Sequence, residues 1–213
     1  MSEVCLINMY KPLFFILIIF SFVSCTAEVT LTLKNDDSVE ISFEGGAGEA
    51  FTRMISSAAG VNGGAAGDYL VDADAVSYEL ARADFSDVKV NQKKGGSVNI
   101  SVIDKKQTSY IFSSKIAKAE SGKLKPYITR KSLEDFYEAS DEQTRTILDL
   151  FLAPVFNGEE MSEDEYIEMV GSFYGDGAAN EVSTSLVKIN LIAKDGSKET
   201  LNIPLTQLLC GNF

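Results

Sequence analysis

Two stretches of the chain have the residue types and spacing of a chemical site. Ser185 and Lys188 could form a nucleophile and its base on a helix, but their stretch alternates like a strand, where residues three apart face opposite sides. The segment FEGGAGEAF, 43–51, has the setting of a phosphate-binding turn, yet Phe51 replaces the last glycine of the motif and no lysine follows. The sequence therefore predicts a strand at the first stretch and a flexible turn into a helix at the second.

The densest ionisable group is acidic. The run NGEEMSEDEYIE, 157–168, surrounds a predicted helix start, where the helix macrodipole favours negative charge. Neither this run, nor VDADA at 71–75, nor the loop-like YGDGAANE at 174–181 has the ligand spacing of an EF-hand. Paired carboxylates could serve a glycosidase, but no pair among the thirty-one Asp and Glu stands out. We expect no metal site and no cofactor.

The composition argues against several further classes of function. Histidine is absent, which removes the commonest general base and the usual imidazole ligands of zinc and copper. Nineteen Lys and Arg against thirty-one Asp and Glu give a formal charge of −12, so the phosphates of nucleic acid would be repelled. We therefore expect a protein that is not an enzyme and binds no nucleic acid.

The amino-terminal segment has the features of a signal peptide. Its apolar run, LFFILIIFSFV at 13–23, is eleven residues long and follows Lys11. A helix that spans a bilayer needs about 20 residues, so this run is too short to span and fits a signal peptide. Translation from Met9 instead of Met1 would give a tidier signal.

The run ends in FVSC, 22–25, which resembles the lipobox of bacterial envelope lipoproteins, with Phe22 where leucine is usual. It looks most like the relaxed boxes of small uncharacterised spirochaete lipoproteins. The resemblance implies that residues 1–24 are removed and that Cys25 carries fatty acyl chains such as palmitate, which anchor the protein in a membrane. Thr26, in place of a retaining aspartate, favours the outer membrane. The alternative is an ordinary secretory signal with an incidental cysteine.

The remaining cysteines are too few and scattered for a disulfide scaffold. Cleavage would discard Cys5 and acylation would occupy Cys25, leaving Cys210 as the only thiol of the mature chain. We expect Cys210 to be a buried, small apolar residue.

The mature chain, 25–213, reads as a single globular α+β domain with a mobile Gly-rich loop at 60–68. Alternating apolar residues predict a hairpin at each end, and the two hairpins would pair in one sheet. Three further strands are predicted as a meander in DVKV, GSVNISVI and TSYIFSS, the last at 108–114. We expect an antiparallel sheet of about six or seven strands with helices packed on one face.

Helix starts are predicted at Ser132, Ser140 and Ser162, and the last two have the spacing of a capping box. The helix after Ser162 should pack on the core through an apolar stripe. The stripe consists of Tyr166, Met169, Val170 and Phe173.

The segment TRTILDLFLAPVF, 144–156, is too apolar for a surface helix with one buried stripe. It is either the central core helix or the wall of a groove that takes a lipid, a peptide or another envelope protein. The groove would be lined by Leu148, Phe151, Leu152, Val155 and Phe156.

Together these observations lead to a lipid-anchored protein of the cell envelope, periplasmic or at the outer membrane, with a binding or scaffolding domain. The alternative function is a carrier of a lipid or other hydrophobic ligand in the groove formed by 144–156. The partners are thus the membrane, through Cys25, and either another envelope protein or a hydrophobic ligand.

Overall fold

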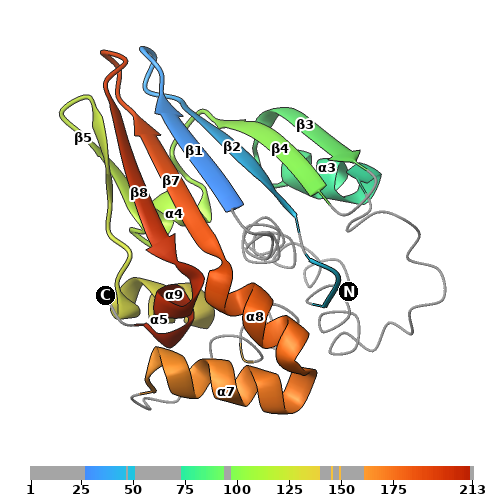
Figure 1. The fold of residues 1–213 in the computed structure, drawn as a ribbon. Coiled ribbons are helices and arrows are strands. Elements are labelled where there is room, and N and C mark those ends of the chain that lie inside the picture. The colour runs from blue at the N-terminus through green and yellow to red at the C-terminus, as the bar shows by residue number, and fades with distance from the viewer. Residues whose placement is uncertain are drawn as a thin grey trace, which may run out of the picture.

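The computed structural model describes residues 27–46, 48–50, 73–93, 97–139, 145, 149 and 161–211. The fold is α+β, as predicted, with a six-stranded sheet, a separate two-stranded sheet and several helices (Figure 1). The strands of the large sheet are β1 (Ala27–Leu33), β2 (Val39–Gly46), β3 (Ser86–Lys93), β4 (Ser97–Asp104), β7 (Leu186–Ile192) and β8 (Lys198–Pro204). The described helices are α3 (Ala73–Arg82), α4 (Tyr110–Ser113), α5 (Arg130–Ala139), α7 (Glu163–Tyr174), α8 (Asp176–Thr184) and α9 (Leu205–Cys210).

The large sheet has the strand order β3-β4-β2-β1-β7-β8. The two terminal hairpins, β1–β2 and β7–β8, lie side by side in it, which confirms the predicted pairing. The sheet is mainly antiparallel, but β1 and β7 run parallel, with Val29 opposite Ile189. The chain therefore returns through α7 and α8 to the end of the sheet where β1 began, and these helices gather with α9 at that end (Figure 1).

The predicted third strand of the central meander is wrong, because 108–114 contains the short helix α4. The cause is Asp104, which is buried at the end of β4. Its carboxylate accepts hydrogen bonds from the backbone N–H groups of Lys106, Thr108 and Ser109 at 3.1, 3.2 and 2.9 Å. These bonds turn the chain away from the sheet. The strands that follow, β5 (Ala117–Glu120) and β6 (Lys123–Pro126), form the small sheet.

One face of the large sheet forms the core. The side chains of β1, β2 and β4 that point to this face are buried, whereas those of the outer strands β3 and β8 are partly buried or exposed. Helix α3 packs on this face through Val76 and Leu80. The face also contacts α5 through the fully buried Phe136. The buried strand residues of the two central hairpin strands are Val29, Leu31, Leu33, Val39, Ile41 and Phe43.

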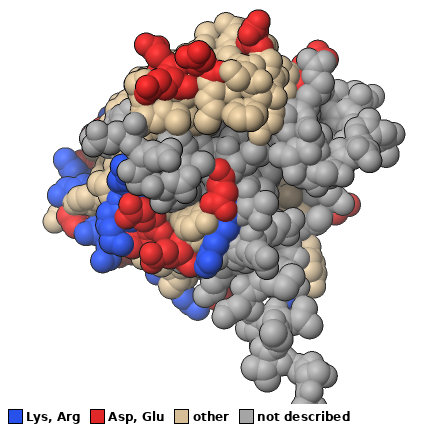
Figure 2. Space-filling view, turned by 90° about the horizontal axis from the view of Figure 1, so that it is seen from below, with Lys and Arg blue, Asp and Glu red and all other residues tan. Residues whose placement is uncertain are grey.

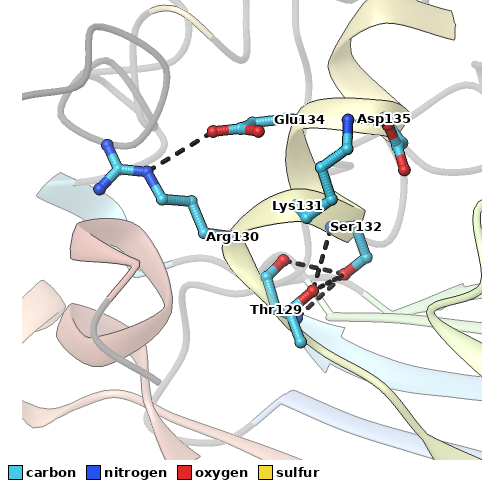
Figure 3. A network of polar contacts seen from close by, with 6 residues as sticks. All are labelled: Thr129, Arg130, Lys131, Ser132, Glu134 and Asp135. Atoms are coloured by element: carbon cyan, nitrogen blue, oxygen red, sulfur yellow. Dashed lines mark hydrogen bonds and ion pairs between the residues drawn. The ribbon is translucent and has the colours of Figure 1, made fainter.

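Helix α5 begins two residues before the predicted start at Ser132. The backbone N–H of Ser132 donates to Thr129 Oγ1 at 3.1 Å, and the N–H of Thr129 donates to Ser132 Oγ at 3.0 Å (Figure 3). This reciprocal pair is a capping box in which Ser132 takes the place of the usual Glu. The same turn carries two ion pairs four residues apart, Arg130–Glu134 and Lys131–Asp135 (Figure 3).

The capping box predicted at Ser162 is confirmed. Glu165 N–H donates to Ser162 Oγ at 3.2 Å, and Ser162 N–H donates to Glu165 Oε2 at 2.9 Å. The predicted start at Ser140 lies outside the described residues.

The predicted apolar stripe of α7 is right in its first two turns and wrong in its last turn. Tyr166 and Val170 are buried and Met169 packs against the core, but Phe173 is 76% exposed. Phe173 lies in the last turn, just before Gly175 turns the chain with a φ of 88°. The segment after this turn was expected to be a loop and instead forms α8.

Candidate functional site

The outward face of the six-stranded sheet carries polar side chains that the strand registers align across its width. We name two rows on this face. The polar row contains one residue from each strand in sheet order, namely Lys89, Ser101, Ser42, Thr30, Asn190 and Thr200. The charged row lies beside it and contains Asn91, Asn99, Glu44, Glu28, Lys188 and Asn202.

The spacing of a sheet fixes the dimensions of this surface. Neighbouring strands lie about 4.8 Å apart and residues two apart on one strand about 7 Å. The two rows therefore form a strip roughly 24 Å long and about 7 Å between rows. Side chains at the strip's ends, such as Thr200 and Asn202 on β8, are exposed, whereas Ser42 and Thr30 in the middle are half-buried.

A hydrogen-bond network fixes the part of the strip on β1, β7 and β8. Asn190 is 0% exposed and lies at its centre. The Asn190 amide nitrogen donates to Thr30 Oγ1 at 3.2 Å and to Glu28 Oε1. The Thr200 hydroxyl donates to Asn190 Oδ1 at 2.9 Å. Because both ends of this amide are bonded, the surrounding side chains are held in one arrangement.

The network ends in an ion pair. Lys188 Nζ lies 3.1 Å from Glu28 Oε2, and the two side chains are 33% and 39% exposed. The hydrogen bond from Lys188 lowers the pKa of Glu28; partial burial opposes this shift, and the bond from Asn190 adds to it. The parallel register of β1 and β7 places Glu28 directly opposite Lys188. The register of β1 and β2 places the same carboxylate opposite Glu44, so two like charges are neighbours in the charged row.

These side chains supply hydroxyls, amides and charges of both signs, all of which recognise hydrogen-bonding groups. Such a surface suits a polar partner, because an apolar partner would leave the desolvated polar groups without bonds. The arrangement can therefore offer hydrogen bonds and charges of both signs to a polar molecule.

The site residues predicted from the sequence are not among the residues that the structure describes. Cys25 and the five groove residues, Leu148, Phe151, Leu152, Val155 and Phe156, lie outside the described residues, as does the loop at 60–68. The carrier function therefore remains a prediction.

The Gly-rich turn after β2 is occupied by the chain's own carboxylate. The backbone N–H of Ala50 donates to Glu181 Oε1, from α8, at 3.2 Å. A Cβ on Gly48 would lie 2.4 Å from the same carboxylate, so a larger residue there would displace the end of the Glu181 side chain. Glu181 thus takes the position at which a phosphate-binding turn would hold its anion. Residues 43–46 of this segment belong to β2, so the predicted turn begins only after Gly46.

Ser185 and Lys188 do not form a dyad. The Ser185 hydroxyl donates to the Glu181 carbonyl at 2.6 Å, and Lys188 pairs with Glu28. Their stretch enters β7, as the alternation predicts.

Cys210 is buried in α9, as predicted. Burial raises the pKa of its thiol to about 11, and the nearby Glu163 adds to the shift. The thiol is therefore protonated at neutral pH, which makes it a poor nucleophile.

Acidic side chains gather on α7 and α8, whose segment 163–184 contains six Asp and Glu and no Lys or Arg. Figure 2 views the molecule from the side of these helices and shows Asp and Glu without basic neighbours at the top of the view. Three of these acids lie in the first turn of α7, where the macrodipole favours them, and the Glu163 carboxylate also accepts a bond from Thr206. No group of three or more Cys, Asp or Glu in the described part of the chain could hold a metal ion.

The polar row was not predicted from the sequence. Alternation alone identifies Thr30, Ser42 and Ser101 as outward residues of their strands, but their alignment depends on the strand order. The closest signal was the likeness of the two terminal hairpins, which suggested that they share a sheet.

No protein-family model, curated protein or solved structure matches the chain. Among the helices that the structure describes, none has the length and apolar character needed to cross a membrane.

Proposed function

We propose that the protein is a lipid-anchored, non-enzymatic cell-envelope protein whose domain binds a polar envelope component through the polar and charged rows. The observation that supports this function best is the network around Asn190. A fully buried amide on β7, whose partners reach the surface on the two flanking strands β1 and β8, fixes a set of hydrogen-bonding groups before any ligand arrives. Such preorganisation lowers the entropy lost on binding.

The anchor is supported by the FVSC segment and by its position in the chain. Only Thr26 separates Cys25 from Ala27, the first residue of β1. Consecutive Cα atoms are about 3.8 Å apart, so an acylated Cys25 would hold the start of the sheet within roughly 8 Å of the anchor point. The proposed location is the cell envelope, with the outer membrane favoured by Thr26.

The anchor is tested with Cys25→Ala in the full-length chain. Cells are labelled with a fatty acid, and the protein is followed by phase partition in detergent. We expect the wild-type protein to carry label and enter the detergent phase, and the variant to lose both. Retention of label and detergent partition by the variant would refute the lipid anchor.

The binding surface is tested by placing a photo-reactive amino acid at Ser42, in the middle of the polar row. The matched control position is Tyr78, which is 61% exposed on α3, the helix that packs on the opposite face of the sheet. Intact membranes are irradiated, and the crosslinked products are identified by mass spectrometry. We expect a discrete product from position 42 and none from position 78. Equal products, or none from position 42, would refute the binding surface.

A further inference from the structure

The two outer strands of the large sheet differ in how they are protected from pairing with another strand. In β3 the register with β4 shifts between Ser86 and Lys89, and Asp87 in this irregular stretch has a φ of 53°. A bulge is a device that blocks the addition of a further strand. In β8 the register with β7 is continuous from Lys198 to Pro204. The edge formed by β8 therefore lacks the bulge that protects β3.

The backbone groups that β8 presents at this edge follow from the hydrogen bonds at the two ends of its hairpin. Ala193 N–H donates to the Ser197 carbonyl at 2.9 Å, and Leu205 N–H donates to the Ser185 carbonyl at 3.0 Å. Bonded and non-bonded pairs alternate along an antiparallel ladder, so the odd-numbered residues of β8 bond to β7. The even-numbered residues direct their backbone groups away from β7.

Three residues of β8 therefore offer both an N–H and a C=O at the edge, namely Lys198, Thr200 and Asn202. Pro204 has the same orientation but no N–H. In the part of the chain that the structure describes, β8 pairs only with β7, and no backbone hydrogen bond reaches these outward groups. The three residues that offer both groups are spaced symmetrically about Thr200.

We propose that β8 pairs with β8 of a second copy of the chain, antiparallel and about a two-fold axis at Thr200. Thr200 then lies opposite Thr200 of the second copy, and Lys198 lies opposite Asn202 of the second copy. This register forms three hydrogen-bonded residue pairs with two hydrogen bonds in each pair. Together they use every outward N–H and C=O of the three residues, and Pro204 lies outside the interface. This inference is independent of the lipid anchor.

The side chains are compatible with this register. On the outward face it brings together two Thr hydroxyls at the axis and Lys198 with an amide on either side. On the other face Glu199 lies opposite Leu201. No like charges are opposed, whereas a parallel arrangement in register would oppose Lys198 with Lys198 and Glu199 with Glu199. The two polar rows would join end to end at Thr200, giving one continuous surface.

The net charge affects the strength of this association. Each copy carries a formal charge of −12, so two copies repel one another at long range. Salt screens this repulsion but has little effect on backbone hydrogen bonds. We therefore expect the dimer to become tighter as ionic strength rises from low to physiological.

The register is tested by cysteine crosslinking in the full-length chain. Thr200→Cys places two thiols directly opposite one another, within the distance that a disulfide spans. Asn202→Cys is the matched control, because its two thiols would be four residues apart along the strands, roughly 13 Å. Whole-cell lysates are oxidised with copper phenanthroline and analysed on non-reducing gels, with the wild-type chain giving the background from its own cysteines. We expect a dimer from Thr200→Cys alone.

A second pair of variants tests the hydrogen bonds themselves. Thr200→Pro removes the outward N–H without removing a backbone hydrogen bond to β7, although it loses the hydroxyl that donates to Asn190. Thr200→Val is the control, because it loses the same hydroxyl but keeps the outward N–H. By sedimentation in detergent, the proline variant should dimerise about tenfold more weakly or worse, since two of the six bonds are lost, and the valine variant should match the wild type. Dimers from Asn202→Cys as abundant as from Thr200→Cys, no dimer from either, or an unaffected proline variant would overturn the proposal.

Discussion

The two faces of the large sheet use the same backbone for different purposes. The inward face is a row of aliphatic and aromatic side chains that pack in the core, with Phe43 only 1% exposed. The outward face holds hydroxyls, amides and charges, of which only Asn190 is fully buried. Inward residues are constrained by packing, so they specify the fold. Most outward residues are constrained by little in the described structure, which leaves their identities available to specify a partner.

The largest expected difference between the faces comes from the neighbours Phe43 and Ser42. Phe43→Ala should lower the free energy of unfolding by about 3–5 kcal/mol, because it leaves a cavity in the core. Ser42→Ala, one residue away on the outward face, should change it by less than about 0.5 kcal/mol. Chemical denaturation of both variants measures the contrast. Similar losses from both would mean that the outward face is also packed.

A smaller effect is expected at Asn190, where the outward face contains a buried network. Asn190→Ala should cost about 1–3 kcal/mol, because Glu28, Thr30 and Thr200 lose a bonding partner. The control is Asn202→Ala on the neighbouring strand, an exposed amide that should cost less than about 0.5 kcal/mol. Equal stabilities of the two variants in a denaturant titration would contradict the preorganised network.

The smallest effect concerns pH. The pKa of Glu28 is lowered in the folded protein, so its ion pair stabilises the fold above the ordinary value of 4.5 and loses this contribution as pH falls through the folded pKa. The difference in stability between wild type and Glu28→Gln should therefore be present at pH 7 and vanish in acid. Solvent screening limits it to less than about 1 kcal/mol. Thermal unfolding at several pH values measures it, with Glu168→Gln at an exposed position on α7 as the control for loss of a negative charge.

Local sequence patterns predicted much of the fold. Alternation identified the terminal hairpins, and a Ser followed three residues later by Glu identified the start of α7. Both signals lie within a few residues of the element that they describe. The α+β class followed from the order of these elements.

The sequence-based predictions failed where the structure depends on contacts between distant residues, or on contacts that leave no periodic pattern in the sequence. Buried Asp104 turns 108–114 away from the sheet and into α4. The periodicity of apolar residues does not indicate a carboxylate of this kind. Phe173 continues the stripe of α7 but lies in its exposed last turn. The polar row depends on the parallel pairing of Thr30 with Asn190, which are 160 residues apart in the chain.

The outward face of the large sheet is the proposed binding surface. The decisive measurement compares Ser42→Arg with Tyr78→Arg in native membranes, by quantitative mass spectrometry of the material that copurifies after crosslinking. Ser42→Arg adds bulk and charge at the middle of the polar row, and Tyr78→Arg adds them on the far side of the domain. We predict that Ser42→Arg loses the partner while its melting temperature stays that of the control. Partner capture by Ser42→Arg at the level of Tyr78→Arg would contradict the proposal that the outward face is a binding surface.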